Sequence, residues 1–193
     1  AYQYRNNVRL DSTNLTYIEI GANHPVATSS TYLISKAFNT RGILVEPNPA
    51  LAKELETYRV YDQVIEAAVI VGDEEEVEFY LCQENEISSV DKKFVEIWSG
   101  ITVSNPGIES TIRVKTTNVN DLLDLVKNIS VVVLTIDVEG LDLNILKDIN
   151  LNAYRPYIIV IEPSEAYNNG NTDAMIKYMR ENDYALISAN FVN

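Results

Sequence analysis

Acidic and small residues stand at the ends of the apolar runs that could form buried strands. In an open parallel sheet, ligands bind beyond the carboxyl ends of the strands, so residues at these ends face the ligand. Carboxylates there can accept hydrogen bonds from hydroxyls, favour a positive charge or act as a base. The sequence therefore predicts an acidic site for a cationic or hydroxyl-rich ligand. Its strand-end residues are Glu19, Gly21, Glu46, Glu66, Ala67, Ala68, Asp137 and Glu162.

Gly21 follows the first of these runs and allows the backbone to turn tightly beside a ligand. A dinucleotide-binding turn needs the pattern G-x-G-x-x-G, but Asn23 and Val26 occupy its second and third glycine positions. A ligand without a pyrophosphate is therefore favoured, and a nicotinamide-dependent oxidoreductase stays as an alternative. Glu46 lies 25 residues beyond Gly21 (46 − 21), where a carboxylate can accept both ribose hydroxyls of either kind of nucleotide cofactor.

Apolar runs of strand length alternate with segments of helical period, which favours an α/β fold of parallel strands joined by crossover helices. Helix starts are indicated by the cluster 28–30, by Asn48 followed by Pro49, and by Asn118. No repeat or linker interrupts the 193 residues, so we expect one domain over 1–193. Strands are predicted at 15–20, 43–45, 64–71, 77–81, 112–116, 131–136, 157–161 and 184–187.

The segment 83–110 shows no clear period. A long irregular insert within a compact domain is usually functional, so we expect this segment to form a wall or lid of the acceptor pocket. Glu86, Ser88 and Ser89 open the insert and are predicted to bind the acceptor. The alternative for these three residues is a loop that ends in a helix cap.

The charge balance narrows the class of partner. Lys and Arg number 15 against 28 Asp and Glu, a net charge of −13, which disfavours nucleic acids and anionic membrane surfaces. A small-molecule or glycan acceptor is expected instead. The longest apolar runs have strand length, so no membrane span is expected. With Cys82 as the single cysteine and His24 as the single histidine, the sequence excludes a disulfide framework and a zinc site on histidine pairs, and it fits a reducing, cytoplasmic compartment.

Four motifs, in this order, make the chain similar to the FkbM family of S-adenosylmethionine-dependent methyltransferases. They are Ile18-Glu19-Ile20-Gly21-Ala22-Asn23, Val45-Glu46-Pro47-Asn48-Pro49, Val114-Lys115-Thr116 with Asn120-Asp121-Leu122-Leu123, and Thr135-Ile136-Asp137-Val138-Glu139-Gly140 followed by Ile145-Leu146. The resemblance covers roughly residues 15 to 190, and the last motif makes it fairly specific. One departure is His24-Pro25-Val26, which stands where many members have a more glycine-rich turn.

The resemblance implies a Rossmann-like class I methyltransferase fold, with a mostly parallel central sheet and helices on both faces. It also implies S-adenosylmethionine as cofactor and a hydroxyl of a sugar or polyketide as acceptor. Asp137 and Glu139 would face the methyl group and the acceptor. The implied cofactor contacts are Glu19, Gly21, Ala22 and Asn23 at the methionine part, Glu46 and Pro47 at the ribose, Glu66, Ala67 and Ala68 near the adenine, and Asp137.

Methyl transfer to a hydroxyl needs an aligned donor and acceptor and a base for the hydroxyl proton. Asp137 and Glu139 are predicted as this base, and His24 is the third candidate. In the alternatives, Asp137 caps a helix and His24 is an exposed turn residue. Asp137 and Glu162 could instead bind a divalent cation, although no metal is predicted. A domain that binds without catalysis, and a methyltransferase acting on nitrogen or protein, remain open beside the oxidoreductase.

Overall fold

Five parallel strands form the central sheet of the computed structural model, which describes residues 13–99 and 107–189. Their order is β3-β2-β1-β7-β8, and all four pairings are parallel. Every residue of β1 and of β7 is buried, as expected for interior strands of a sheet that is covered on both faces. The strands are β1 (Leu15–Ile20), β2 (Ile43–Val45), β3 (Gln63–Ile65), β7 (Val131–Ile136) and β8 (Ile158–Ile161).

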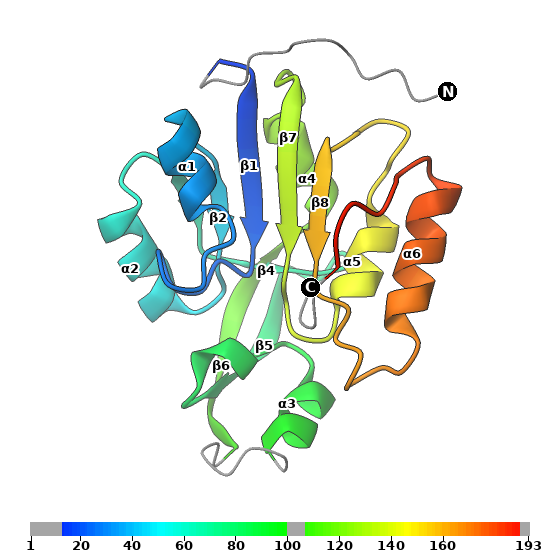
Figure 1. Ribbon diagram of the computed structural model, residues 1–193. Coiled ribbons are helices and arrows are strands. Elements are labelled where there is room, and N and C mark those ends of the chain that lie inside the picture. The colour runs from blue at the N-terminus through cyan, green and yellow to red at the C-terminus, as the bar shows by residue number, and fades with distance from the viewer. Residues whose placement is uncertain (1–12, 100–106, 190–193) are drawn as a thin grey trace.

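Helices cover both faces of this sheet, as predicted (Figure 1). Alternate residues of a strand point to opposite faces, so each face has its own core. Tyr17 packs in a cluster with Leu55 of α2, whereas Ile18 packs in a cluster with residues of α4, α5 and α6. The helices are α1 (Tyr32–Phe38), α2 (Pro49–Tyr58), α4 (Val119–Leu125), α5 (Asp142–Asp148) and α6 (Asn171–Glu181). No helix of the described ranges has the length and apolarity needed to cross a membrane.

The helix caps expected on α2 and α4 are present. The Asn48 side chain accepts a hydrogen bond from the backbone N–H of Ala50, and Pro49 is the first helical residue of α2. The Asn118 side chain accepts a hydrogen bond from the backbone N–H of Asn120 at the start of α4. The cluster 28–30 does not provide the N-cap of α1, which is Thr31.

A second, three-stranded sheet lies beyond the carboxyl ends of the large one, below it in Figure 1. In it, β6 pairs antiparallel with β5 and parallel with β4. The predicted strand 64–71 was wrong as one element, because the chain leaves the large sheet after Ile65 and joins the small one at Ala68. The strands are β4 (Ala68–Val69), β5 (Glu76–Cys82) and β6 (Ile108–Thr117).

Two other predictions differ from the structure. The insert 83–110 is not irregular throughout, since it contains the 3₁₀ turn η1 (Asn85–Ile87), α3 (Lys92–Ser99) and the start of β6. The α3 helix has about two turns, too short for its period to stand out, and 100–106 lie outside the described residues. The segment 184–187 is no strand, because it pairs with no strand of the described ranges. Tyr184 is instead held by its hydroxyl, which donates to the Pro156 carbonyl at 2.7 Å.

Candidate functional site

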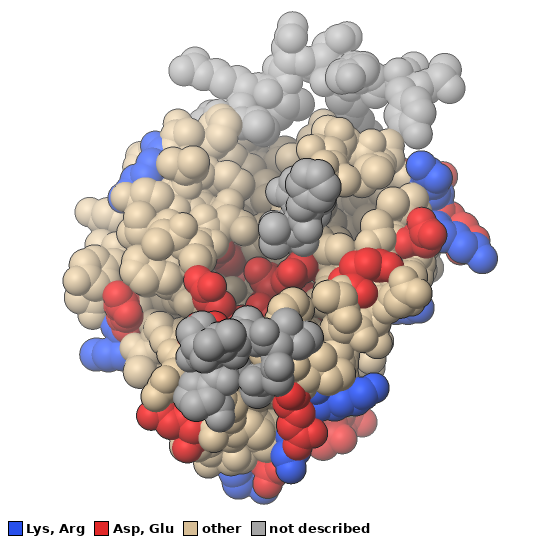
Figure 2. All heavy atoms as spheres, turned by 60° about the horizontal axis from the view of Figure 1, so that its bottom comes forward, with Lys and Arg blue, Asp and Glu red and all other residues tan. Residues whose placement is uncertain are grey.

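A cavity of about 340 Å³ opens at the carboxyl ends of the central strands, on the side where the small sheet lies. In the view of Figure 2, acidic side chains gather at the centre of this face, and the lysines and arginines lie toward its rim. Five carboxylates line the cavity, and none of its described lining residues is Lys, Arg or His. The five are Glu46, Glu86, Asp137, Glu139 and Glu162.

Gly21 forms the turn after β1, and only glycine fits there. Its φ is +77°, and a Cβ at this position would lie 1.7 Å from the carbonyl oxygen of Asp137. The backbone N–H groups of Gly21 and Ala22 both donate to the carbonyl of Val45. The turn therefore joins the ends of β1, β2 and β7 at one point of the cavity wall.

Glu46, at the end of β2, is a buried carboxylate, and each of its two oxygens already accepts one hydrogen bond from a backbone N–H group. Asn23 donates to Oε2 at 2.9 Å, and Asn48 donates to Oε1 at 2.8 Å. Burial raises the pKa of Glu46 to about 7, although both hydrogen bonds act in the opposite direction. Each carboxylate oxygen has a second lone pair, so Glu46 can accept two further hydrogen bonds from a ligand in the cavity.

Glu19 and Ala22, both predicted to touch the cofactor, do not line the cavity. The Glu19 carboxylate is turned toward the start of α1, where it accepts hydrogen bonds from Ser29 Oγ at 2.9 Å, Ser30 N at 2.6 Å and Thr31 Oγ1 at 2.5 Å. Burial raises the pKa of Glu19, and these bonds offset part of that effect. Ala22 packs in the core. Glu19 therefore holds the loop beside the cavity and is not in the cavity wall.

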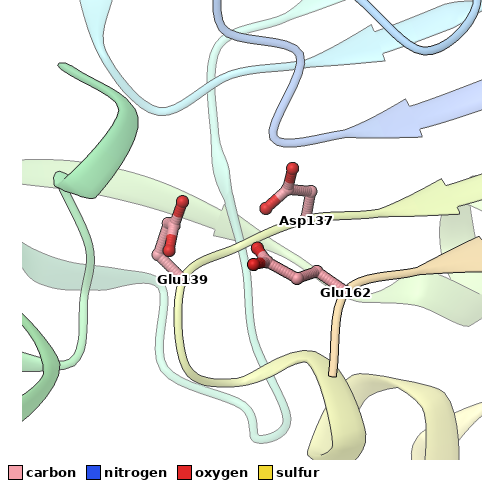
Figure 3. A group of neighbouring side chains, drawn as sticks. All are labelled: Asp137, Glu139 and Glu162. Atoms are coloured by element: carbon pink, nitrogen blue, oxygen red, sulfur yellow. The ribbon is translucent and has the colours of Figure 1, made fainter. Parts of the chain in front are cut away.

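Three carboxylates converge in the cavity wall at the ends of β7 and β8 (Figure 3). Asp137 follows β7, Glu139 lies two residues further, and Glu162 follows β8; one oxygen of each lies within 4.8 Å of the others. Oxygen ligands in such a group could hold a hard divalent cation. The geometry also suits proton transfer, because carboxylates this close do not all ionise readily.

The protonation of this group follows from partial loss of solvent in the cavity and from mutual repulsion. Burial and the nearby carboxylates, Asp137 first among them, raise the pKa of Glu139 to about 10. Burial and Asp137 raise the pKa of Glu162 to about 8, so that the protonated Glu162 donates a hydrogen bond to Asp137. Burial raises the pKa of Asp137 as well, but this bond stabilises its charged form. The hydrogen bond therefore favours the charged form of Asp137 over that of Glu162.

Asp142 and Ser89 hold the loop that carries Asp137 and Glu139. The Asp142 carboxylate accepts hydrogen bonds from the backbone N–H groups of Val138 at 3.0 Å and Gly140 at 3.1 Å. The Ser89 hydroxyl donates to the Glu139 carbonyl at 2.7 Å. Since α5 begins only at Asp142, the alternative in which Asp137 caps a helix is wrong. Sequence reasoning missed the role of Asp142 altogether.

The remaining predicted residues divide into two groups. Those in the cavity wall are Gly21, Asn23, Pro47, Ala67, Ala68, Glu86 and Ser88. Glu66, Ser89 and His24 do not line it. The His24 side chain is 43% exposed, and its Nδ1 accepts from the backbone N–H groups of Val26 and Ala27. Its geometry is that of the exposed turn residue considered as the alternative.

Sequence reasoning missed several wall residues because nothing in their type pointed to a site. Thr28 and Ser30 were interpreted only as part of a helix cap, yet both line the cavity. Asn85 lines it too, and its side-chain oxygen accepts a hydrogen bond from Asn48 Nδ2 at 3.4 Å. Phe79 belongs to the small sheet and Val90 to the insert. The hydrophobic period of the sequence does not indicate that these two segments pack against the cavity.

Comparison with known proteins identifies one family for this part of the chain. A family model described as "Methyltransferase FkbM domain" matches residues 19–186. Neither the curated proteins nor the solved structures gave a match. Every residue that lines the cavity falls within the matched stretch, so the family match and the cavity concern the same part of the molecule.

Proposed function

Since the chain belongs to the methyltransferase FkbM family, we propose that it transfers a methyl group from S-adenosylmethionine to a hydroxyl of a sugar, a glycan or another small molecule. Two parts of the cavity take separate tasks in this proposal. The cofactor side consists of residues 21–31 and 45–48 together with Ala67 and Ala68. The acceptor side consists of residues 86–90, 137–139 and 162.

Glu46 carries the proposal. It is a buried carboxylate at the end of β2, its geometry is fixed by two backbone N–H groups, and it borders the cavity. Its remaining lone pairs match the two hydroxyls of a ribose, which donate to acceptors of this kind. Gly21 and Asn23 then lie against the methionine part of the cofactor, and Ala67 and Ala68 against the adenine.

The charge of the cavity supports S-adenosylmethionine over a nicotinamide cofactor. The cavity has five carboxylates and no basic group among its described lining residues. S-adenosylmethionine carries positive charges on its sulfonium and its ammonium, which attract the ionised carboxylates and favour ionisation of those whose pKa is raised, such as Glu46. A nicotinamide dinucleotide would bring a doubly charged pyrophosphate to the same wall, and like charges in a partly buried site repel strongly.

The residues of the acceptor side account for the chemistry. Bound S-adenosylmethionine supplies an activated methyl group, whose transfer to a hydroxyl oxygen breaks the carbon–sulfur bond and releases the hydroxyl proton. Asp137 accepts this proton, because the hydrogen bond with Glu162 favours its charged form. Glu139 lies beside them, and its raised pKa suits it to donate a hydrogen bond to the acceptor.

A ligand titration tests the cofactor, and a turnover assay tests the reaction. S-adenosylmethionine and S-adenosylhomocysteine are expected to raise the melting temperature and to bind in calorimetry, whereas NAD is not. Stabilisation by NAD and not by the sulfonium cofactor would overturn the proposal. Purified protein is then incubated with methyl-labelled S-adenosylmethionine and a panel of hydroxyl acceptors. Cofactor binding without transfer to hydroxyl, amine or protein acceptors would identify a binding domain, and transfer to amines or protein alone would refute the hydroxyl acceptor.

A further inference from the structure

Arg59, the residue after the last turn of α2, is a buried cation outside the cavity wall. It is 4% exposed, and it does not line the cavity. A guanidinium has five N–H donors in a fixed plane, and Arg59 has five acceptors for them. Nε donates to Asp62 Oδ2 at 2.8 Å. Nη1 donates to Pro25 O at 3.1 Å and to Ser29 Oγ at 2.9 Å. Nη2 donates to Tyr17 OH at 3.0 Å and to Thr31 Oγ1 at 3.3 Å.

Three of these acceptors belong to one segment, the loop 23–31 between β1 and α1. The same loop contributes Asn23, Thr28 and Ser30 to the cavity wall. Arg59 therefore binds some residues of this loop, while other residues of the same loop form part of the cofactor side.

The hydroxyls of Ser29 and Thr31 lie between two opposite charges. Each accepts a hydrogen bond from Arg59 and donates one to Glu19 Oε2. The positive charge of Arg59 also lowers the pKa of Glu19 and so offsets part of the effect of burial. Loss of the guanidinium would remove the donor to Thr31, leave Ser29 with only the backbone N–H of Tyr32 as donor, and remove the positive charge that acts on Glu19.

Arg59 is itself held in place from the other side. Asp62 Oδ1 accepts hydrogen bonds from Tyr17 OH at 2.5 Å and from the backbone N–H of Gly42 at 2.9 Å, which fixes the carboxylate between β1 and the start of β2. The guanidinium carbon lies 5.8 Å from the centre of the Tyr17 ring and 5.6 Å from that of Tyr32. A lysine could keep the ion pair with Asp62, but its ammonium lacks the planar fork that reaches Pro25, Ser29 and Thr31 together.

We propose that Arg59 is a positioning residue for the methyl donor: through Pro25, Ser29 and Thr31 it sets the shape of the loop 23–31 that forms the cofactor side of the cavity. This inference rests on the proposed function. The acceptor side is carried by other elements, namely η1 and the ends of β7 and β8. The effect of Arg59 therefore falls on cofactor affinity and leaves the affinity for the acceptor nearly unchanged.

The test is R59K, with R41K as the matched control. Arg41 is an exposed arginine whose side chain stacks on Tyr61. R41K therefore makes the same chemical change as R59K at a position away from the loop. Calorimetry with S-adenosylhomocysteine, well below the melting temperature of each variant, is expected to give a Kd about tenfold higher for R59K and an unchanged Kd for R41K. In turnover assays, the KM for S-adenosylmethionine should rise in R59K while the KM for the acceptor stays within about twofold of wild type.

Stability is measured separately, because a purely structural Arg59 would lower the melting temperature without changing the Kd of the folded protein. A Kd for R59K within twofold of wild type, or an equal rise in the KM of donor and acceptor, overturns the inference. If R59K does not fold, S29A replaces it, since it removes one of the three loop contacts and is expected to raise the Kd by a smaller factor in the same direction. Absence of S-adenosylhomocysteine binding in the wild type would instead refute the proposed function itself.

Discussion

Glu46 and Glu162 are both glutamates at strand ends of one parallel sheet, but their surroundings differ. On the cofactor side, Glu46 accepts hydrogen bonds from two backbone N–H groups, and burial alone raises its pKa. On the acceptor side, Glu162 lies against Asp137 and Glu139, with no positive charge among the described lining residues. A carboxylate fixed by backbone donors suits a ligand that always carries the same hydroxyls. Carboxylates that crowd one another have pKa values near neutrality and above, which suits proton transfer.

Gly21 belongs to the one turn on which both sides depend, so its substitution should have the largest effect. G21A puts a Cβ 1.7 Å from the Asp137 carbonyl at a φ of +77°. The backbone conformation alone costs an alanine about 1–2 kcal/mol, and the overlap adds to this cost. We expect a clear fall in the melting temperature and loss of both cofactor and acceptor binding, measured by thermal denaturation and calorimetry. Retained cofactor affinity in G21A would mean that the two sides are not joined at this turn.

Asp137 tests the acceptor side alone. Its replacement in D137N keeps the shape of the side chain but removes the proton acceptor, so turnover should fall by about 10²- to 10⁴-fold. Cofactor affinity should stay within severalfold of wild type, because Glu46 and the loop 23–31 are unchanged. Steady-state kinetics and calorimetry on the same preparation separate the two quantities. An equal loss of both would assign Asp137 to the cofactor side and would break the comparison.

Glu46 provides the converse test. E46Q keeps the size of the side chain, but its amide nitrogen cannot accept the hydrogen bonds that one carboxylate oxygen accepts. We expect the Kd of S-adenosylhomocysteine to rise about tenfold, with kcat at saturating cofactor nearly unchanged. E78Q is a suitable control, since Glu78 is an exposed glutamate of β5 that does not line the cavity. A large fall in kcat without a change in Kd would contradict a binding role for Glu46.

The contrast between the two sides also explains what the sequence could predict. Mostly apolar strands, such as β1 and β7, were predicted with their bounds, because complete burial leaves a strong signal. The caps at Asn48 and Asn118 were predicted because capping is local chemistry. The predicted strand 184–187 was wrong because β-propensity does not provide a pairing partner.

Within the site, strand-end carboxylates were predicted, but their orientations were not. Glu19 is the last residue but one of β1 and Glu46 follows β2, and only the fold turns Glu19 toward the loop and Glu46 toward the cavity. Arg59 and Asp62 carry no motif, because their partners at Tyr17, Ser29 and Thr31 are distant in sequence. Contacts of this kind depend on which elements the sheet order brings together, and a single sequence does not contain that order explicitly.

The pH dependence of stability is the smallest expected effect. Glu46 on the cofactor side and Glu162 on the acceptor side should contribute to it over different pH ranges. Burial raises the pKa of Glu46 to about 7, and burial with Asp137 raises that of Glu162 to about 8. A native state that binds more protons than the unfolded state loses stability as pH rises. These contributions are complete below the ordinary glutamate pKa and are lost as pH rises through about 7 and about 8. The free energy of unfolding of the ligand-free protein should therefore fall between about pH 5 and pH 8, with a slope of at most about 1.4 kcal/mol per pH unit for each extra proton.

Denaturant titrations at several pH values check this slope, and two variants sharpen it. E46Q should reduce the fall up to about pH 7, whereas E162Q should reduce it up to about pH 8. Asp142, with a pKa raised by burial to about 7, and Glu139, with a pKa raised to about 10, keep part of the fall in both variants. S-adenosylmethionine, as a cation, should bind more tightly as these carboxyls ionise, so its Kd should decrease over the same range. A stability that rises from pH 5 to pH 8 in the wild type would mean that the carboxylates of the cavity are already ionised at low pH. The acceptor side would then differ from the cofactor side in position alone and not in protonation.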